Sequence, residues 1–236
     1  MSRPAVLFDL DGTLLDTPAG IVRAFTGAFA QLSVPAVDPL DIRATIGLPL
    51  PVAFGKLLAV PVEDPVVATG VEHYQRCFRQ VVLPGAAELV FPGVLSGLAR
   101  LRAAGYPLAV ATSKFYASAD AVLVAAGLRD LFDDVLGADQ VSNPKPHPEM
   151  AFALLDRLGS QPADAVMVGD TSHDLLMAHA AGLRSIAVTY GVHSAAELSA
   201  AEPTWLVDSF AEVVEHIERA LPAWQYAPIA RGTGGI

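Results

Sequence analysis

From Phe91-Pro92-Gly93 to residue 221, the sequence alternates between helical and extended patterns. Helical periodicity covers 94–104, 117–126, 148–158, 175–181 and 210–221, and short apolar runs that predict strands cover 107–111, 132–136, 165–168, 185–189 and 205–207. Strands that alternate with helices favour parallel pairing, with helices on both faces of one sheet. The sequence therefore predicts an α/β fold built on a Rossmann-like parallel sheet.

One further strand is predicted far from the others, at the N-terminus, where the apolar run AVLF ends in Asp9. Between it and Phe91, residues 16–90 show helical periodicity punctuated by prolines, and no convincing strand pattern. The simplest organisation is a core domain made of 1–15 and 91–221, with an all-helical domain, 16–90, inserted after the first strand. Residues 222–236 are expected to form a loose C-terminal tail.

Composition excludes several classes of protein. The 236 residues carry a formal net charge of -10 and a pI of about 4.9, which disfavours nucleic acid as a partner. Although 53% of the residues are hydrophobic, Pro, Gly or a charge breaks every apolar run before the roughly 20 residues needed to cross a bilayer. A lone Cys77 cannot form an intramolecular disulfide, and acids at positions 9 and 11 leave no room for a secretory leader. We expect a cytoplasmic protein with no membrane partner; the sequence carries no signal for an oligomeric state.

Polar side chains follow four of the predicted strands at their carboxyl ends, where open parallel sheets bind ligands. They are Asp9 and Asp11, Thr112 and Ser113, Lys145, and Asp170 with Asp174. Crowded carboxylates raise one another's pKa unless a cation intervenes, and Mg²⁺ prefers such oxygen ligands. A lysine and a hydroxyl suit the oxygens of an anionic substrate. Together these groups predict a phosphoryl-transfer site.

The same residues resemble a known family. Phe8-Asp9-Leu10-Asp11-Gly12-Thr13-Leu14 is similar to the first motif of the haloacid dehalogenase (HAD) superfamily, and Thr112, Lys145 and Gly169-Asp170-x-x-x-Asp174 are similar to its second, third and fourth motifs, in the same order. The resemblance covers nearly the whole chain. The helical insertion resembles the C1 cap of the phosphoglycolate phosphatase and beta-phosphoglucomutase branch.

The resemblance implies a role for each matching residue. Asp9 would be the nucleophile that forms an aspartyl phosphate, and Asp11 would be the general acid and base. Dehalogenases of the superfamily lack this second acid, so Asp11 favours phosphoryl over halide chemistry. Mg²⁺ would be held by Asp9, the backbone carbonyl of Asp11, Asp170 and, directly or through water, Asp174. Thr112, Ser113 and Lys145 would bind the phosphoryl oxygens.

Simpler interpretations stand beside these roles. Asp170 is also suited to capping the next helix, and Asp174 to lying exposed in its first turn. For Lys114, a role in the site and an exposed surface position are about equally compatible with the sequence. His173 and His193 are expected to be surface or capping residues, because the histidine spacing matches no zinc site.

The insertion is expected to set substrate choice. Its segment from Arg43 to Pro49 resembles the loop that related caps lower onto the substrate, so Arg43 is a candidate for a distal anionic or hydroxyl-rich group and Gly47 for close backbone approach. Arg76 and Arg79 are further candidates, or solvated helix charges. Junctions near 16–18 and 83–85 are expected to act as hinges.

Three functions fit the sequence. The first is a Mg²⁺-dependent phosphatase acting on a small phosphomonoester: phosphoglycolate, a sugar phosphate, or the 5′-phosphate of a nucleoside-like or glycosylated metabolite. The second is a phosphomutase of the beta-phosphoglucomutase type, which would use a cap cation such as Lys56, Arg76 or Arg79. The third is a receiver-like module regulated by a phosphorylated aspartate, although receivers are shorter and lack the helical insertion.

Overall fold

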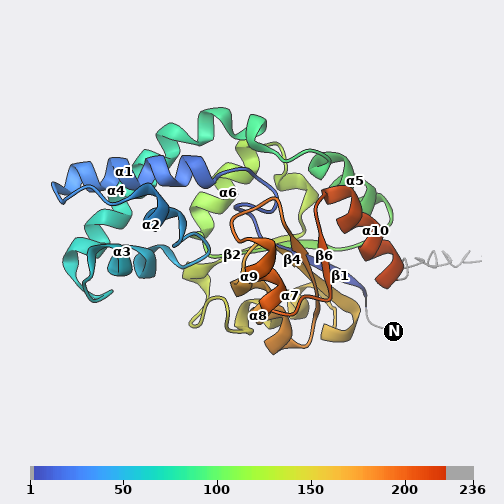
Figure 1. Ribbon diagram of the computed structural model, residues 1–236. Coiled ribbons are helices and arrows are strands. Elements are labelled where there is room, and N and C mark those ends of the chain that lie inside the picture. The colour runs from blue at the N-terminus through green and yellow to red at the C-terminus, as the bar shows by residue number, and fades with distance from the viewer. Residues whose placement is uncertain (1–2, 222–236) are drawn as a thin grey trace, which may run out of the picture.

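A six-stranded parallel sheet forms the centre of the computed structural model, which describes residues 3–221 (Figure 1). The strands are β1 (Ala5–Phe8), β2 (Leu108–Thr112), β3 (Asp134–Gly137), β4 (Ala165–Gly169), β5 (Arg184–Val188) and β6 (Trp205–Val207), in the order β3-β2-β1-β4-β5-β6. Phe8 pairs with Val110 of β2 on one side and with Val168 of β4 on the other. The strand order reverses at β1, so the residue after Phe8 lies at the switch point where such sheets bind ligands. The predicted α/β, Rossmann-like fold is confirmed.

Helices cover both faces of the sheet. On one face, Val6 and Phe8 of β1 pack in a core with α5 (Val94–Ala103), α6 (Tyr116–Ala125) and α10 (Phe210–Ala220). On the other face, Ala5 and Leu7 pack with α7 (Glu149–Leu158) and α8 (Ser172–Ala181). Successive side chains of a strand point to opposite faces, so β1 is apolar at every position and its four residues are all buried.

A second group of helices lies to one side of the sheet (Figure 1). We call α1 (Pro18–Leu32), α2 (Pro39–Arg43), α3 (Leu50–Leu58) and α4 (Pro65–Val81) the insertion helices. Each has a proline in its first turn. Backbone N–H groups there have no acceptor within the helix, so the missing N–H of proline costs no hydrogen bond. The side chains of Asp38 and Asp64 cap α2 and α4 by accepting from the backbone N–H groups of Leu40 and Val66.

The chain passes between the sheet and the insertion helices twice, and the two crossings are hydrogen-bonded to each other. The N–H of Asp16 donates to the carbonyl of Leu89 at 2.7 Å, and the N–H of Phe91 donates to the carbonyl of Leu14 at 3.1 Å. Leu15 and Val90 form an antiparallel bridge between them. We call this pair of segments, 14–16 and 89–91, the crossing pair.

Several boundaries differ from the sequence expectation. Helix α8 begins at Ser172, three residues before the apolar periodicity, because Asp174 accepts hydrogen bonds from Thr171 at its start. The short helix α9 (Ala195–Ala200) was not predicted; Ser194 and Glu197 cap each other's backbone N–H groups there. Four 3-10 segments complete the fold: η1 (Leu83–Leu89), η2 (Arg129–Leu131), η3 (Ala138–Gln140) and η4 (Pro162–Asp164).

Two further expectations concern the C-terminal tail and the membrane. The predicted tail, 222–236, lies outside the described residues. Within residues 3–221, no helix combines the length and apolar character that a bilayer crossing requires.

Candidate active site

Asp9 follows the central strand and is 6% exposed. Its N–H continues the ladder by donating to the carbonyl of Val168 at 2.8 Å, which holds Asp9 between the ends of β2 and β4. Lys145 reaches it from the loop after β3. The ammonium donates to Asp9 Oδ1 at 2.6 Å, to Asp174 Oδ1 at 2.6 Å and to the carbonyl of Ala111 at 3.1 Å. One oxygen of Asp9 is therefore fixed by a buried cation.

Burial dominates the electrostatics of this pair. It raises the pKa of Asp9 to about 7; Lys145 opposes this effect, and the charge of Asp174 adds to it. For Lys145, burial disfavours the ammonium, but the carboxylates of Asp174 and Asp9 outweigh it, and its pKa is raised. Lys145 thus stays charged between two carboxylates.

Asp170 is a third buried carboxylate, and no described cation pairs with it. Thr13 Oγ1 donates to Asp170 Oδ1 at 2.8 Å, and the N–H of Val192 donates to Asp170 Oδ2 at 2.8 Å. Burial, followed by the charges of Asp9 and Asp174, raises the pKa of Asp170 well above its usual value. Gly12, at φ +87°, lies against this side chain, and a Cβ there would overlap Asp170 Oδ2. Asp170 is therefore tightly enclosed and poorly neutralised.

The three carboxylates fit a divalent cation. Oxygen atoms of Asp9, Asp170 and Asp174 lie within 4.8 Å of one another, and all three residues are buried. Among the described residues, one ammonium, that of Lys145, contacts two of these three acids, which leaves a negative excess that a hard cation with oxygen ligands would offset. Both oxygens of Asp174 accept hydrogen bonds from Lys145 and Thr171, and both oxygens of Asp170 accept from Thr13 and Val192, so a cation there would use the remaining lone pairs of these oxygens. Neither the capping role for Asp170 nor the exposed position for Asp174 describes what the structure shows.

The carboxylate of Asp11 points away from this cluster. Thr17 Oγ1 donates to Asp11 Oδ1 at 2.6 Å, and the ammonium of Lys114 lies 3.0 Å from Asp11 Oδ2. The Lys114 side chain is 7% exposed and its ammonium lies 4.1 Å from the ring centroid of Phe78. The surface interpretation of Lys114 is therefore wrong, because its charge is paired inside the molecule.

The other candidates are distributed around the junction of the sheet and the insertion helices. Thr112 lies beside Asp9 and Asp11 in the cavity lining, and its hydroxyl accepts from the N–H of Lys114 at 3.2 Å. Ser113 Oγ donates to the carbonyl of Gly47 at 2.7 Å, which joins the β2 end to the insertion. Gly47 adopts φ +99° and packs against Thr171 and His173.

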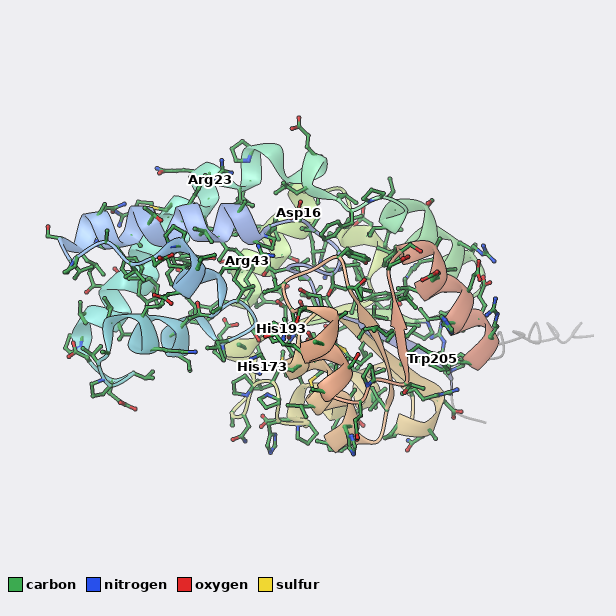
Figure 2. All side chains as sticks on the ribbon, in the orientation of Figure 1. Asp16, Arg23, Arg43, His173, His193 and Trp205 are labelled. Atoms are coloured by element: carbon green, nitrogen blue, oxygen red, sulfur yellow. The ribbon has the colours of Figure 1, made fainter. Side chains whose placement is uncertain are left out.

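Arg43 is not among the described residues that line the cavity. Its guanidinium donates to the carbonyl of Gly191 at 3.4 Å, so it bridges the insertion to the loop after β5. Figure 2 shows Arg43, His193 and His173 at this junction. His193 has a capping role, since its Nδ1 accepts from the N–H of Ser172 at the start of α8.

A cavity of about 580 Å³, including its open part, lies between the strand ends and the insertion helices. Its lining residues are Asp9, Asp11, Ile21, Phe25, Thr45, Ile46, Gly47, Leu48, Leu50, Ala53, Tyr74, Gln75, Thr112, Ser113, Lys114, Phe115 and Ser118. The two acids form a polar end and the insertion supplies most of the apolar surface. Lys56, Arg76 and Arg79, the cations considered for a phosphomutase, are not in this lining.

Comparison with known proteins identifies the family. The sequence model described as haloacid dehalogenase-like hydrolase matches residues 6–188, from β1 to the end of β5. The chain belongs to this family. The match includes Asp9, Asp11, Thr112, Lys145, Asp170 and Asp174.

Relatives of this HAD hydrolase are named phosphatases. Probable phosphatase IndB of Dickeya dadantii (strain 3937) is 59% identical over 212 residues, which cover 90% of this chain and 92% of the relative. Phosphoglycolate phosphatase of Vibrio vulnificus (strain YJ016) is 32% identical over 216 residues, 89% and 94% of the two chains. The crystal structure of CbbY from Rhodobacter sphaeroides in complex with phosphate superimposes with a TM-score of 0.74 at 30% identity, and covers 90% of this chain and 96% of that one. The protein is a phosphatase of the HAD superfamily.

Sequence reasoning missed several groups that shape this HAD site. Thr13 and Thr171 anchor Asp170 and Asp174, and Thr17 anchors Asp11. Thr13 and Thr17 stand within six residues of Asp11, so a search for hydroxyls near the acids would have found them. Tyr74 carries no such signal, because only folding of α4 brings it to the cavity.

Proposed function

We propose that this phosphatase hydrolyses a small-molecule phosphomonoester in two steps, with Mg²⁺ and an aspartyl-phosphate intermediate on Asp9. The observation that carries the proposal is the position of Asp9 at the polar end of the cavity, with one oxygen fixed by Lys145 at 2.6 Å. Holding one oxygen leaves the other to meet phosphorus in a defined direction. A cavity enclosed by the insertion helices suits a small substrate.

In the first step, the free oxygen of Asp9 forms a bond to phosphorus and the bond from phosphorus to the ester oxygen breaks. Asp11 gives its proton to the leaving alkoxide. In the second step, water attacks phosphorus and passes a proton to Asp11, and Asp9 leaves as a carboxylate. Thr112 and Lys145 would hold the phosphoryl oxygens during both steps.

Asp9, Asp170 and, behind them, Asp174 would hold Mg²⁺, together with the backbone carbonyl of Asp11. When bound, the ion neutralises charge on the transferring phosphoryl group. The support for this cofactor is the buried cluster of three acids, two of which share the ammonium of Lys145.

The direct test is steady-state release of p-nitrophenol from p-nitrophenyl phosphate in the presence of Mg²⁺. Multiple turnovers per chain are expected. A single stable acyl phosphate per chain would instead support a receiver-like switch and would overturn the proposal.

The Asp11→Asn variant is expected to lose about 10²- to 10⁴-fold in kcat on an alkyl phosphate, because the alkoxide then leaves without a proton. The loss on p-nitrophenyl phosphate should be much smaller, since p-nitrophenolate is a stable leaving group. Initial rates on both substrates measure the difference. Equal losses on the two substrates would contradict the role of Asp11 as an acid.

Chelation by excess EDTA is expected to stop turnover, and added Mg²⁺ to restore it. Binding to the folded state alone should also raise the free energy of unfolding, by about 2.7 kcal/mol at a Mg²⁺ concentration 100 times its Kd. Thermal unfolding with and without Mg²⁺ measures this second effect. Asp170→Asn should reduce the stabilisation by Mg²⁺, and Asp130→Asn, at an exposed position, should leave it unchanged. Full activity in EDTA would refute the metal site.

A further inference from the structure

The cavity has an apolar wall built by the insertion helices. Ile21 and Phe25 on α1 line it, and the segment before and into α3 adds Leu48 and Leu50. Phe25 is held in place by Tyr74, at a centroid separation of 4.7 Å, and by Phe54 at 4.8 Å. A wall of fixed carbon surface gains free energy when an apolar face of a ligand covers it.

Two polar side chains beside this wall make no hydrogen bond to another side chain or to the backbone within the described residues. Tyr74 is 5% exposed, lines the cavity, and makes no side-chain hydrogen bond with another residue of the described range 3–221. The carboxamide of Gln75, the next residue on α4, also lines the cavity and has no such bond within that range. Because both side chains line the cavity, a ligand there can reach the hydroxyl and the carboxamide. Both groups are therefore available to a ligand.

The charges of the cavity disfavour a second anionic group on the substrate. Asp9 and Asp11 lie at its polar end. Among the described lining residues, the cation is Lys114, and its ammonium is already placed 3.0 Å from Asp11 and 4.1 Å from the ring centroid of Phe78. An anionic group on the alcohol part of the substrate would lose its hydration against the apolar wall. It would also be repelled by the two carboxylates.

We propose that the alcohol part of the substrate is uncharged and contains a ring. The ring packs against Ile21, Phe25 and Leu50, and its polar edge bonds with the Tyr74 hydroxyl and the Gln75 carboxamide. This inference rests on the proposed function, which places the phosphoryl group at Asp9. A ring has an apolar face that can cover this wall, whereas a two-carbon glycolate has none.

The first test compares kcat/KM of the wild-type enzyme, with Mg²⁺, for four esters: p-nitrophenyl phosphate, 2-phosphoglycolate, ribose 5-phosphate and uridine 5′-monophosphate. For at least one of the two ring-bearing metabolites, kcat/KM is expected to exceed the value for 2-phosphoglycolate by about 100-fold or more. A preference for 2-phosphoglycolate, with p-nitrophenyl phosphate still hydrolysed, would overturn this inference and leave the phosphatase function intact. No turnover of any ester would overturn the proposed function itself.

The second test alters the polar groups. Tyr74→Phe and Gln75→Leu are each expected to lower kcat/KM for the preferred ring-bearing ester about three- to tenfold, mainly through KM, because each removes a hydrogen bond to an uncharged group. Gln80→Leu, at an exposed position of the same helix, is the matched control and should change nothing. Unchanged kinetics in both folded cavity variants would refute the assigned contacts.

A third variant reverses the charge preference. Gln75→Lys adds an ammonium to the wall. It is expected to raise the ratio of kcat/KM for 2-phosphoglycolate to kcat/KM for the ring-bearing ester by about tenfold, whereas Gln80→Lys should leave this ratio unchanged. Circular dichroism and thermal unfolding confirm that each variant is folded before its kinetics are compared. An identical ratio in Gln75→Lys and Gln80→Lys would count against the placement of the alcohol part beside α4.

Discussion

Replacing Asp9 with asparagine is expected to lower kcat by at least about 10⁴-fold while changing the free energy of unfolding by about 1 kcal/mol or less. The amide keeps the shape of the side chain and still accepts a hydrogen bond from Lys145, but it does not form the bond to phosphorus. Burial already raises the pKa of Asp9 to about 7, so loss of its charge removes little stabilisation. Steady-state turnover and urea unfolding measure the two quantities on the same preparation.

The control for this variant is Asp130→Asn, which makes the same chemical change at an exposed position. It should keep wild-type turnover and wild-type stability. Retained activity in Asp9→Asn would refute the nucleophile. Loss of both activity and fold in Asp9→Asn would contradict the expectation that its charge contributes little to stability.

Replacing Lys145 with methionine is expected to lower the free energy of unfolding by about 3–5 kcal/mol, as well as to abolish turnover. The ammonium lies 2.6 Å from both Asp9 and Asp174, and its side chain is 1% exposed. Its removal leaves two buried carboxylates facing each other with no described cation between them. Chemical unfolding in EDTA measures the loss, since added metal would otherwise compensate for the missing charge.

A double variant separates lost charge pairing from lost packing. Adding Asp9→Asn to Lys145→Met removes one of the two uncompensated acids, so the double variant should be more stable than Lys145→Met alone. The coupling energy between the two changes is expected to be about 1–3 kcal/mol. If the two effects simply add, the cost of Lys145→Met comes from packing and the ion-pair explanation fails.

The convergence of Asp9, Lys145, Asp170 and Asp174 is predictable from sequence for a topological reason. Each follows an apolar run that reads as a strand, and the carboxyl ends of parallel strands share one edge of a sheet. The continuous apolar run in β1 and the repeated strand–helix pattern define that sheet without any knowledge of distant contacts. Local patterns are sufficient here because the site is built on the sheet itself.

The contacts made by the insertion helices are not predictable in this way. Lys114 is balanced between site and surface in the sequence, and only the packing of Phe78 over it decides its burial. Arg43 stands in a segment that resembles a substrate loop, yet its guanidinium meets the carbonyl of Gly191. Tyr74 has the periodicity of an ordinary core residue on α4. Each outcome depends on contacts between segments that are far apart in the sequence, which no local pattern encodes.

The crossing pair has a consequence for how the chain tolerates change. The Asp16–Leu89 and Phe91–Leu14 hydrogen bonds hold the two ends of the 17–88 segment together. The segment therefore leaves the sheet and returns to it at adjacent points, as a closed loop does. Closing a loop costs little more when it is lengthened, since the entropy grows only with the logarithm of its length. Substituting a different helical unit between the same two anchor points would leave the hydrogen-bonded strands in place, and Asp11 would keep its position if the new unit retained the hydroxyl of Thr17. The helices between the two crossings can thus change in evolution while the acids at the strand ends keep their positions.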